Sequence, residues 1–136
     1  MILKELVRHA IFRERASSEA YCRFLRKRGV RIGEGTFFFA PKTTTVDMTR
    51  PYMLSIGRNV MVAAGGTILS HDYGWSGVKG VQGDVYGSCD ETLIDDNVFL
   101  GVNSVILKGA HVGANVIIGA GSVVSGDIPD NCVAAG

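Results

Sequence analysis

The sequence predicts an all-β solenoid, a parallel β-helix of hexapeptide repeats with an α-helical cap at its N-terminus. Between residues 94 and 129 the chain repeats every six residues, as IDDNVF LGVNSV ILKGAH VGANVI IGAGSV VSGDIP. The first position of each block is aliphatic, and the fifth position is small or β-branched. An α-helix cannot keep a six-residue stripe on one face, and a lone strand has period two. Period six therefore predicts short strands joined by turns and stacked in parallel coils. The 18 glycines and an aromatic content of only 8% agree with narrow coils around aliphatic side chains.

Two helices are expected before the repeats, in a segment covering residues 1–29. In residues 2–12 the apolar side chains fall at helical spacing, at Leu3, Leu6, Val7, Ala10 and Ile11. A second helix is expected from an N-cap at Ser17 or Ser18 to Arg28, with Gly29 as a left-handed C-cap. We expect both helices to cover the open edge of the first coil.

The β-helix is expected to fill residues 30–136, with one long insertion. Residues 32 and 38 are six apart, and the register returns at Ile56, Val62 and Ile68. The next clean block starts at Ile94, 26 residues after Ile68 and two more than a multiple of six. The glycine-rich stretch between them predicts a loop over residues 71–92 that leaves the solenoid. Loops of this length in a compact domain are usually functional or disordered.

Composition narrows the function classes. At 136 residues the chain has room for one domain, and neither a transmembrane span nor a signal-peptide core is expected. The three cysteines are widely spaced without a C-x-x-C pair, which disfavours a disulfide framework or zinc site and favours the cytoplasm. Residues 1–31 hold nine Lys or Arg against three Glu. This basic segment is interpreted either as a peripheral contact with an anionic membrane or as an ordinary solvated helix face. Neither a nucleic-acid-binding module nor a phosphate loop is recognised.

His71 is the strongest candidate for chemistry. It follows the apolar strand Thr67-Ile68-Leu69, at the junction where the regular coil gives way to the loop. An imidazole with a pKa near its usual value of about 6.5 accepts a proton at neutral pH. Asp72 or a backbone carbonyl is expected to fix its tautomer. His9 and His111 are interpreted as hydrogen-bonding or surface residues, and Cys89 as a bystander thiol.

The hexapeptide blocks, the segments APKTTTVDMTRPYMLSIGRNV and ILSHDYGW, and the ending IGAGSVVSGDIPDNCVAAG together resemble the hexapeptide-repeat acyltransferases. Within that family the chain is most similar to the maltose/galactoside and polysaccharide O-acetyltransferases, over about residues 29–136. The resemblance implies a left-handed β-helix with about 18 residues per coil. It also implies a homotrimer with active sites between subunits. His71 would then be the general base that removes the proton from a sugar or glycan hydroxyl, which attacks the thioester of acetyl-CoA directly and takes up the acetyl group. No metal site is expected, because the sequence has no H-x-x-x-x-H pair.

Motif matching also assigns binding residues. Those expected along the pantetheine arm of acetyl-CoA are Val102, Ser104, Ala120, Ser125 and Gly126. The family commonly has Thr-Lys where this chain has Ser125-Gly126, and it usually continues beyond Gly136 with further cofactor contacts. Those expected at the acceptor are Asp47, Asp72, Tyr73 and Trp75, with a turn-capping role as the alternative for Asp47 and loop packing for Trp75.

Three other functions stay open. They are a non-catalytic β-helix scaffold, N-acetyl transfer to an amino sugar, and a γ-type carbonic anhydrase. The last is disfavoured because the chain has no two histidines five residues apart.

Overall fold

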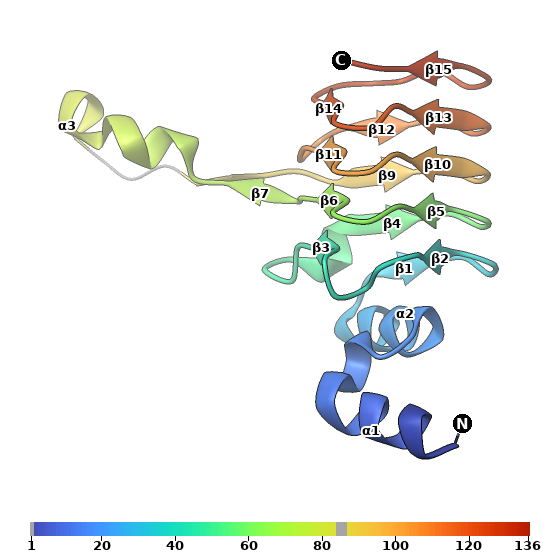
Figure 1. Cartoon of the computed structure of the whole chain (residues 1–136). Helices are drawn as coiled ribbons and strands as arrows, with labels where there is room; N and C mark the ends of the chain where they lie inside the picture. Colours follow the sequence, from blue (N-terminus) through green and yellow to red (C-terminus); the bar gives the residue numbers. More distant parts are fainter. Residues whose placement is uncertain (1, 84–86) are drawn as a thin grey trace.

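The computed structural model describes residues 2–83 and 87–136, and it begins with helices (Figure 1). Helix α1 (Ile2–Phe12) runs into the 3-10 turn η1 (Arg13–Arg15), and helix α2 (Ser18–Arg28) follows. The Ser17 side chain accepts a hydrogen bond from the Ala20 N–H, which satisfies a free donor of the first turn. Gly29 ends α2 with φ of 109°, a left-handed conformation that glycine adopts without penalty. Both predicted caps are confirmed.

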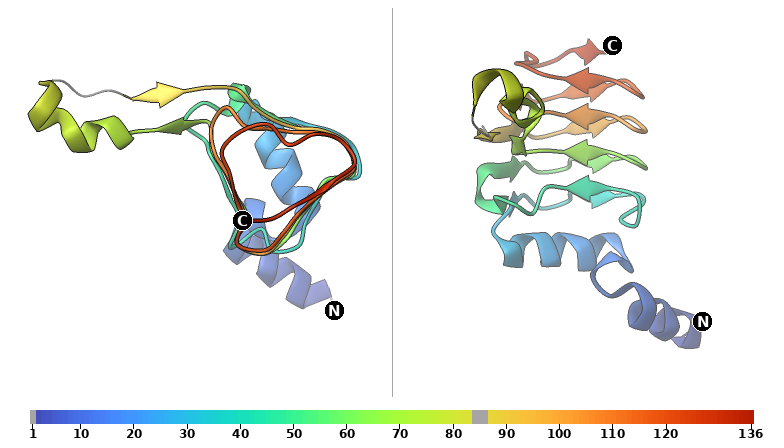
Figure 2. Two further views of the ribbon diagram at one scale, coloured as in Figure 1. Left: turned by 90° about the horizontal axis from the view of Figure 1, so that it is seen from above. Right: turned by 90° about the vertical axis from the view of Figure 1, so that its left-hand side faces the viewer.

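Three parallel sheets form the body of the protein, and Figure 2 shows from above that they enclose a roughly triangular outline. The first sheet has the order β1-β4-β9-β12, the second β15-β13-β10-β5-β2 and the third β14-β11-β6-β3. Val98 pairs with Val116 and Val105 pairs with Val123, so one full circuit takes 18 residues. The predicted parallel strands and N-terminal helices are therefore confirmed.

Each of the first four circuits places one strand in each sheet, and the last part of the chain adds β15 to the second sheet. The strands of the first sheet are β1 (Arg31–Ile32), β4 (Leu54–Ile56), β9 (Thr92–Ile94) and β12 (His111–Val112). Those of the second are β2 (Phe37–Phe38), β5 (Met61–Val62), β10 (Val98–Leu100), β13 (Val116–Ile118) and β15 (Val133–Ala134). Those of the third are β3 (Thr45–Val46), β6 (Thr67–Ile68), β11 (Val105–Ile106) and β14 (Val123–Val124).

The hydrophobic core lies inside the stack of coils, and the first position of each hexapeptide block supplies side chains to it. All six first-position side chains are at most 5% exposed: Ile94, Leu100, Ile106, Val112, Ile118 and Val124. At the corner after the first sheet, Asn59, Asn97, Asn115 and Asn131 have positive φ, which Asn tolerates better than most residues. Their side-chain amides form a ladder from coil to coil, with bonds of 3.3, 3.0 and 2.8 Å. The Asn turns therefore recur at the same corner of successive coils, in step with the buried aliphatic side chains.

The predicted insertion leaves the stack as an arm (Figures 1 and 2). Strands β7 (His71–Asp72) and β8 (Ser88–Cys89) form an antiparallel pair at its base. The arm then carries the 3-10 segment η3 (Gly74–Val78) and the short helix α3 (Lys79–Gln82). The prediction of a plain loop is corrected to this extent, since the pairing depends on residues far apart in sequence. A smaller insertion, η2 (Pro51–Met53), lengthens the first circuit.

The expectation that both helices cover the first coil is wrong for α1. Helix α2 buries Tyr21, Cys22 and Leu25 against the coil, with the Tyr21 ring meeting Phe38 edge-on at 5.0 Å. In α1 no side chain is buried. One amphipathic helix is enough to close a coil of this width, and α1 lies beyond it (Figure 1).

Candidate active site

The candidate site lies at the corner that follows the third sheet. Asp47 comes directly after β3, Ser70 lies two residues after β6, and His71 begins β7. The parallel register Val46↔Ile68 brings these segments side by side, with the Asp47 N–H bonded to the Ile68 carbonyl at 2.9 Å. Residues 24 positions apart in sequence therefore meet because each follows a strand of the same sheet.

Asp47 Oδ2 accepts three hydrogen bonds. The Ser70 N–H donates at 2.9 Å, the Ser70 hydroxyl at 2.7 Å and the His71 ring Nδ1 at 2.5 Å. The other carboxylate oxygen, Oδ1, accepts the Thr49 N–H at 2.9 Å. Asp47 is only 6% exposed, so its carboxylate is held rigidly inside the protein.

The charge of Asp47 is stabilised by these donors. Burial by itself raises the pKa of the carboxyl group, but the hydrogen bonds from Ser70, Thr49 and His71 outweigh it and hold the pKa well below its usual range. Asp47 is consequently an anion at neutral pH, and a carboxylate anion can only accept a hydrogen bond from the His71 ring. The arrangement fixes the His71 tautomer, with the proton on Nδ1 and the lone pair on Nε2.

The side chain of His71 is 23% exposed, while that of Asp47 is 4% exposed. A ring with one nitrogen anchored on a buried carboxylate and partial access to solvent is suited to take a proton from a bound hydroxyl. The Tyr73 ring meets the His71 ring edge-on at 5.4 Å and bounds the site on the arm side.

Two sequence expectations change here. Asp72 was expected to orient His71, but its Oδ1 accepts the Gly74 N–H at 3.1 Å and its Oδ2 lies near the Ser88 hydroxyl and Lys108 Nζ, at 3.2 and 3.3 Å. Neighbours on a strand point to opposite faces, so Asp72 faces away from His71. Asp47 was expected to bind the acceptor, but burial and four hydrogen bonds leave it no exposed oxygen for that role.

The remaining acceptor candidates lie on the arm. Tyr73 is 55% exposed and placed to contact a ligand beside His71. Trp75 lies in η3, and its side chain is outside the described part of the structure. Cys89 is exposed and pairs directly with His71 in the β7–β8 ladder, a proximity that the sequence did not reveal.

The cofactor candidates divide into three groups. Ser125 and Gly126 are exposed, and the register Ile68↔Ile106↔Val124 places them on the same corner as Ser70 and His71, two strands away. At the usual strand spacing this separation is about 10 Å. A depression of about 290 Å³ on the last coil includes both residues and Gly136.

The other three cofactor candidates do not lie on the corner that carries His71. Val102, at 47%, and Ala120 are both exposed at the corner before the third sheet, where the Gly121 N–H bonds the Val102 carbonyl. Ser104 is fully buried and its hydroxyl has no partner among the described residues, so its side chain cannot line a surface groove. It occupies the inward fifth position of its repeat, which corrects that assignment.

Sequence reasoning missed Ser70, Thr49 and Lys108. Ser70 and Thr49 act on Asp47, and Lys108 pairs with Asp72 from the next coil. The only available signal was the hexapeptide register, which aligns the strand ends of successive coils. That register is blurred between residues 41 and 51. This range contains Asp47, the residue to which both Ser70 and Thr49 donate hydrogen bonds.

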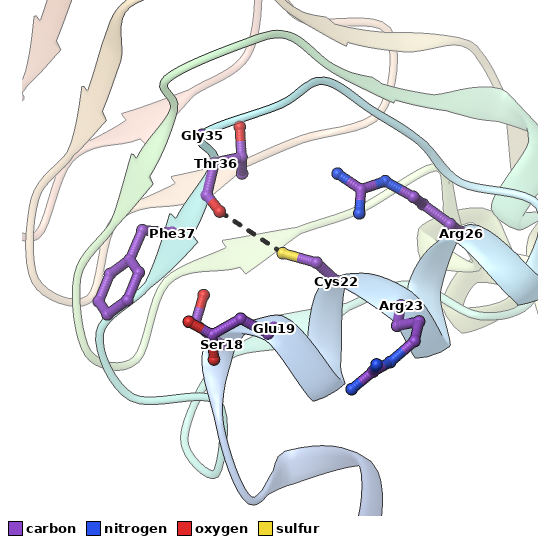
Figure 3. A pocket seen from close by; sticks show the side chains of 8 residues that line it. All are labelled: Ser18, Glu19, Cys22, Arg23, Arg26, Gly35, Thr36 and Phe37. Carbon is purple, nitrogen blue, oxygen red and sulfur yellow. Dashed lines mark hydrogen bonds between the residues drawn. The ribbon is translucent and has the colours of Figure 1, made fainter.

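A second depression, of about 420 Å³, lies between α2 and the first coil (Figure 3). Its walls include Cys22, whose Sγ donates to the Thr36 carbonyl at 3.6 Å, and burial raises the pKa of that thiol. Arg26 points toward the coil and bonds the carbonyls of Ile32 and Gly33. These contacts attach α2 to the β-strands, and the Glu19 carboxylate also lines the depression.

Within residues 2–83 and 87–136, no group of three His, Cys, Asp or Glu side chains could hold a metal ion. The same residues contain no helix that is both long and apolar enough to cross a membrane.

Comparison with known proteins agrees with the fold and the repeat. Residues 91–126 match the family described as bacterial transferase hexapeptide (six repeats). The chain is 36% identical over 109 residues to a galactoside O-acetyltransferase of Lactococcus lactis, covering 79% of the chain and 50% of that relative. It is 38% identical over 116 residues to protein CapG of Staphylococcus aureus, covering 82% and 64%. The chain thus spans half to just under two thirds of these relatives.

Among solved structures, the hexapeptide-repeat acetyltransferase VCA0836 of Vibrio cholerae superposes with a TM-score of 0.64 at 16% identity, over 98% of this chain and 84% of the other. The fold is therefore that of a hexapeptide-repeat acetyltransferase. The chain belongs to the hexapeptide-repeat transferase family.

Proposed function

We propose that the protein is an acetyl-CoA-dependent O-acetyltransferase acting on a sugar or glycan hydroxyl, with His71 as general base. The observation that carries this proposal is the buried Asp47 carboxylate on His71 Nδ1, at 2.5 Å. The relatives support the class: one is named a galactoside O-acetyltransferase, and VCA0836 has also been solved in complex with acetyl-CoA.

In this mechanism His71 Nε2 takes the proton of the acceptor hydroxyl as its oxygen attacks the carbonyl carbon of the thioester. The C–O bond forms while the carbonyl π electrons move to oxygen. The product of this attack is a tetrahedral intermediate. Its collapse breaks the C–S bond, and the departing CoA sulfur receives the proton from His71 Nε2. The Asp47 anion stabilises the imidazolium between the two transfers, and the ring returns to its starting tautomer. A positioned base of this kind contributes about 10²–10⁴-fold in rate.

The placement of the two substrates follows from the stack. The donor would lie along the later coils, where Ser125 and Gly126 are exposed about two strand spacings from His71. The acceptor would enter from the arm side, past the exposed ring of Tyr73. Aromatic faces suit the apolar faces of sugar rings, and the thioester and hydroxyl would meet at Nε2.

We also propose that the coils wind left-handed and that the protein is a cytoplasmic homotrimer. One column of exposed apolar side chains crosses the second sheet in strict register, from Phe37 to Met61, Phe99, Ile117 and Val133. Their exposed fractions run from 38% to 72%, so the column forms a continuous apolar surface in the single chain. Such a stripe on a flat sheet supports self-association through that face. The free thiols of Cys22, Cys89 and Cys132 fit a reducing compartment.

The test is release of free CoA from acetyl-CoA with a panel of mono- and oligosaccharides, compared between wild type and His71→Ala. Loss of at least about 100-fold is expected for the variant. His111→Ala is the matched control, because His111 Nε2 also bonds a carboxylate, Asp95, at 2.9 Å but on the first sheet. Cys89→Ser should retain activity, since the transfer needs no acyl-enzyme.

Activity in His71→Ala would refute the base assignment. Turnover with amino sugars alone would convert the proposal to N-acetyl transfer. Absence of both acetyl-CoA binding and turnover would favour the non-catalytic scaffold.

A further inference from the structure

Helix α1 carries an exposed apolar stripe. Ile2, Leu3, Leu6, Val7 and Ile11 are exposed by 78, 72, 62, 48 and 65%. At 100° per residue these side chains and Ala10 occupy one half of the helix surface. An isolated helix of 11 residues is marginal in water, and a stripe of this kind normally faces something apolar.

The helix is held to the rest of the protein by its other face. The Arg8 guanidinium donates to the Ala16 carbonyl, and Lys42 Nζ lies 3.2 Å from the centre of the Phe12 ring. Arg8 and Phe12 are one turn apart and lie opposite the apolar stripe. The attachment therefore leaves the stripe exposed on the face of α1 opposite Arg8 and Phe12. Helix α1 itself lies at the N-terminal end of the molecule (Figures 1 and 2).

Basic side chains lie along one boundary of the stripe and on the adjacent α2, while His9 and Glu5 lie beyond its other boundary. Lys4 lies beside Ile11 at the boundary of the apolar half. Arg13 follows α1, and Arg23, Arg26, Lys27 and Arg28 are exposed on the adjacent α2. Residues 1–31 carry nine basic and three acidic side chains, while the other 105 residues carry five and ten. The positive charge is thus concentrated at the end of the molecule that presents the apolar stripe.

We propose that α1 is a docking helix for an anionic lipid bilayer, lying in the plane of the surface with its apolar stripe among the acyl chains. An apolar half flanked by Lys and Arg is the pattern of interfacial helices, which bind by apolar burial plus attraction to anionic headgroups. A second copy of this chain fits the surface less well, because two such ends would bring like charges together. The apolar column of the second sheet already offers a face for self-association without that charge. The acceptor site would thereby be held near a membrane.

The experiment is co-sedimentation of the full chain with vesicles of phosphatidylcholine alone and of phosphatidylcholine mixed with phosphatidylglycerol. Wild type should bind the mixed vesicles, bind the neutral ones weakly, and be released by high salt. The double variant Leu3→Glu/Leu6→Glu should lose at least about tenfold in partitioning. Lys4→Ala and Lys27→Ala should each lose about fivefold on the anionic vesicles.

The matched control is Val81→Glu, the same kind of change at a side chain that is 88% exposed on the arm. It should bind as wild type does. Leu3 and Leu6 are also exposed, so circular dichroism spectra of all variants should agree in their β content.

Three results would overturn the proposal. They are failure of wild type to bind anionic vesicles, equal binding by the Leu3→Glu/Leu6→Glu variant, and a fall in oligomer mass of that variant in light scattering. The last would show that a second copy covers the stripe. None of these readouts depends on catalytic activity.

Discussion

The Asp47–His71 pair makes Asp47→Asn the most informative substitution. Asp47 accepts four hydrogen bonds from donors that include two backbone N–H groups. An amide is isosteric with the carboxylate but has only one accepting oxygen. If that oxygen faces Ser70 and His71, the NH₂ group faces the Thr49 N–H, donor against donor. If it faces Thr49, the NH₂ group faces Ser70 and forces His71 to accept at Nδ1, which places the ring proton on Nε2.

Either orientation of the side-chain amide destabilises the folded state. A buried donor left without a partner destabilises the folded state by about 1–3 kcal/mol. The second orientation also removes the lone pair from Nε2, and both remove the anion that stabilises the imidazolium. We therefore expect kcat to fall at least about 100-fold, the lower limit for a positioned base, with a smaller change in the KM for acetyl-CoA.

The pH dependence of the free energy of unfolding gives an independent test of the role of the Asp47 carboxylate. The folded-state pKa of Asp47 lies below its unfolded value, which is about 3.9 for an unperturbed Asp. Its contribution is therefore fully present above about pH 4 and is lost as pH falls toward the folded pKa. Denaturant unfolding should show Asp47→Asn less stable than wild type at pH 7, with the difference shrinking below pH 4.

Nitrogen-15 shifts of the His71 ring would report the tautomer directly. Protonation at Nδ1 in wild type and a change in the variant are expected. The reasoning is refuted if Asp47→Asn keeps kcat within a few-fold of wild type, or if its stability deficit does not depend on pH.

Three further predictions concern the arm, the interior and the apolar column. Lys108→Ala removes the 3.3 Å contact with Asp72 and should speed amide hydrogen exchange at Ser88 and Cys89 with little effect on global stability, since the pair is partly exposed; unchanged exchange would show that Lys108 does not hold the arm. Ser104→Ala removes a buried hydroxyl without a partner and should leave the free energy of unfolding unchanged or raise it, so a loss above about 1 kcal/mol would reveal a missed hydrogen bond. Ile117→Asp puts a charge in the middle of the apolar column and should lower the oligomer mass in light scattering without unfolding the chain, because Ile117 is 49% exposed; an unchanged mass would exclude that face as the interface.

Local sequence was sufficient where one repeat or one turn decides the structure. The inward first position and the caps of α2 each depend on residues within one block of six or one helical turn. The departure of the chain after Ile68 was also readable, because a break in register is itself a local signal. His71 could be chosen for the same reason, since it stands at that break.

The partners of His71 could not be read in this way. Asp47 and Ser70 meet because β3 and β6 end at one corner, and the extra residues of the first circuit hide that alignment in the sequence. The side of a strand that each residue occupies decided between Asp47 and Asp72, and it also turned Ser104 inward. The pairing of Cys89 with His71 required the two ends of the arm to return together.

The sequence by itself determined the repeat, the strand length and the position of the candidate base, because a hexapeptide period admits few other packings. Only the tertiary structure decided which carboxylate anchors His71, which predicted cofactor residues reach the surface, and that α2 alone, without α1, covers the first coil. These outcomes depend on contacts outside the local sequence, where residues 16 or more positions apart become neighbours on adjacent strands. A periodic sequence specifies that such contacts exist, while their chemistry depends on the insertions that interrupt the period.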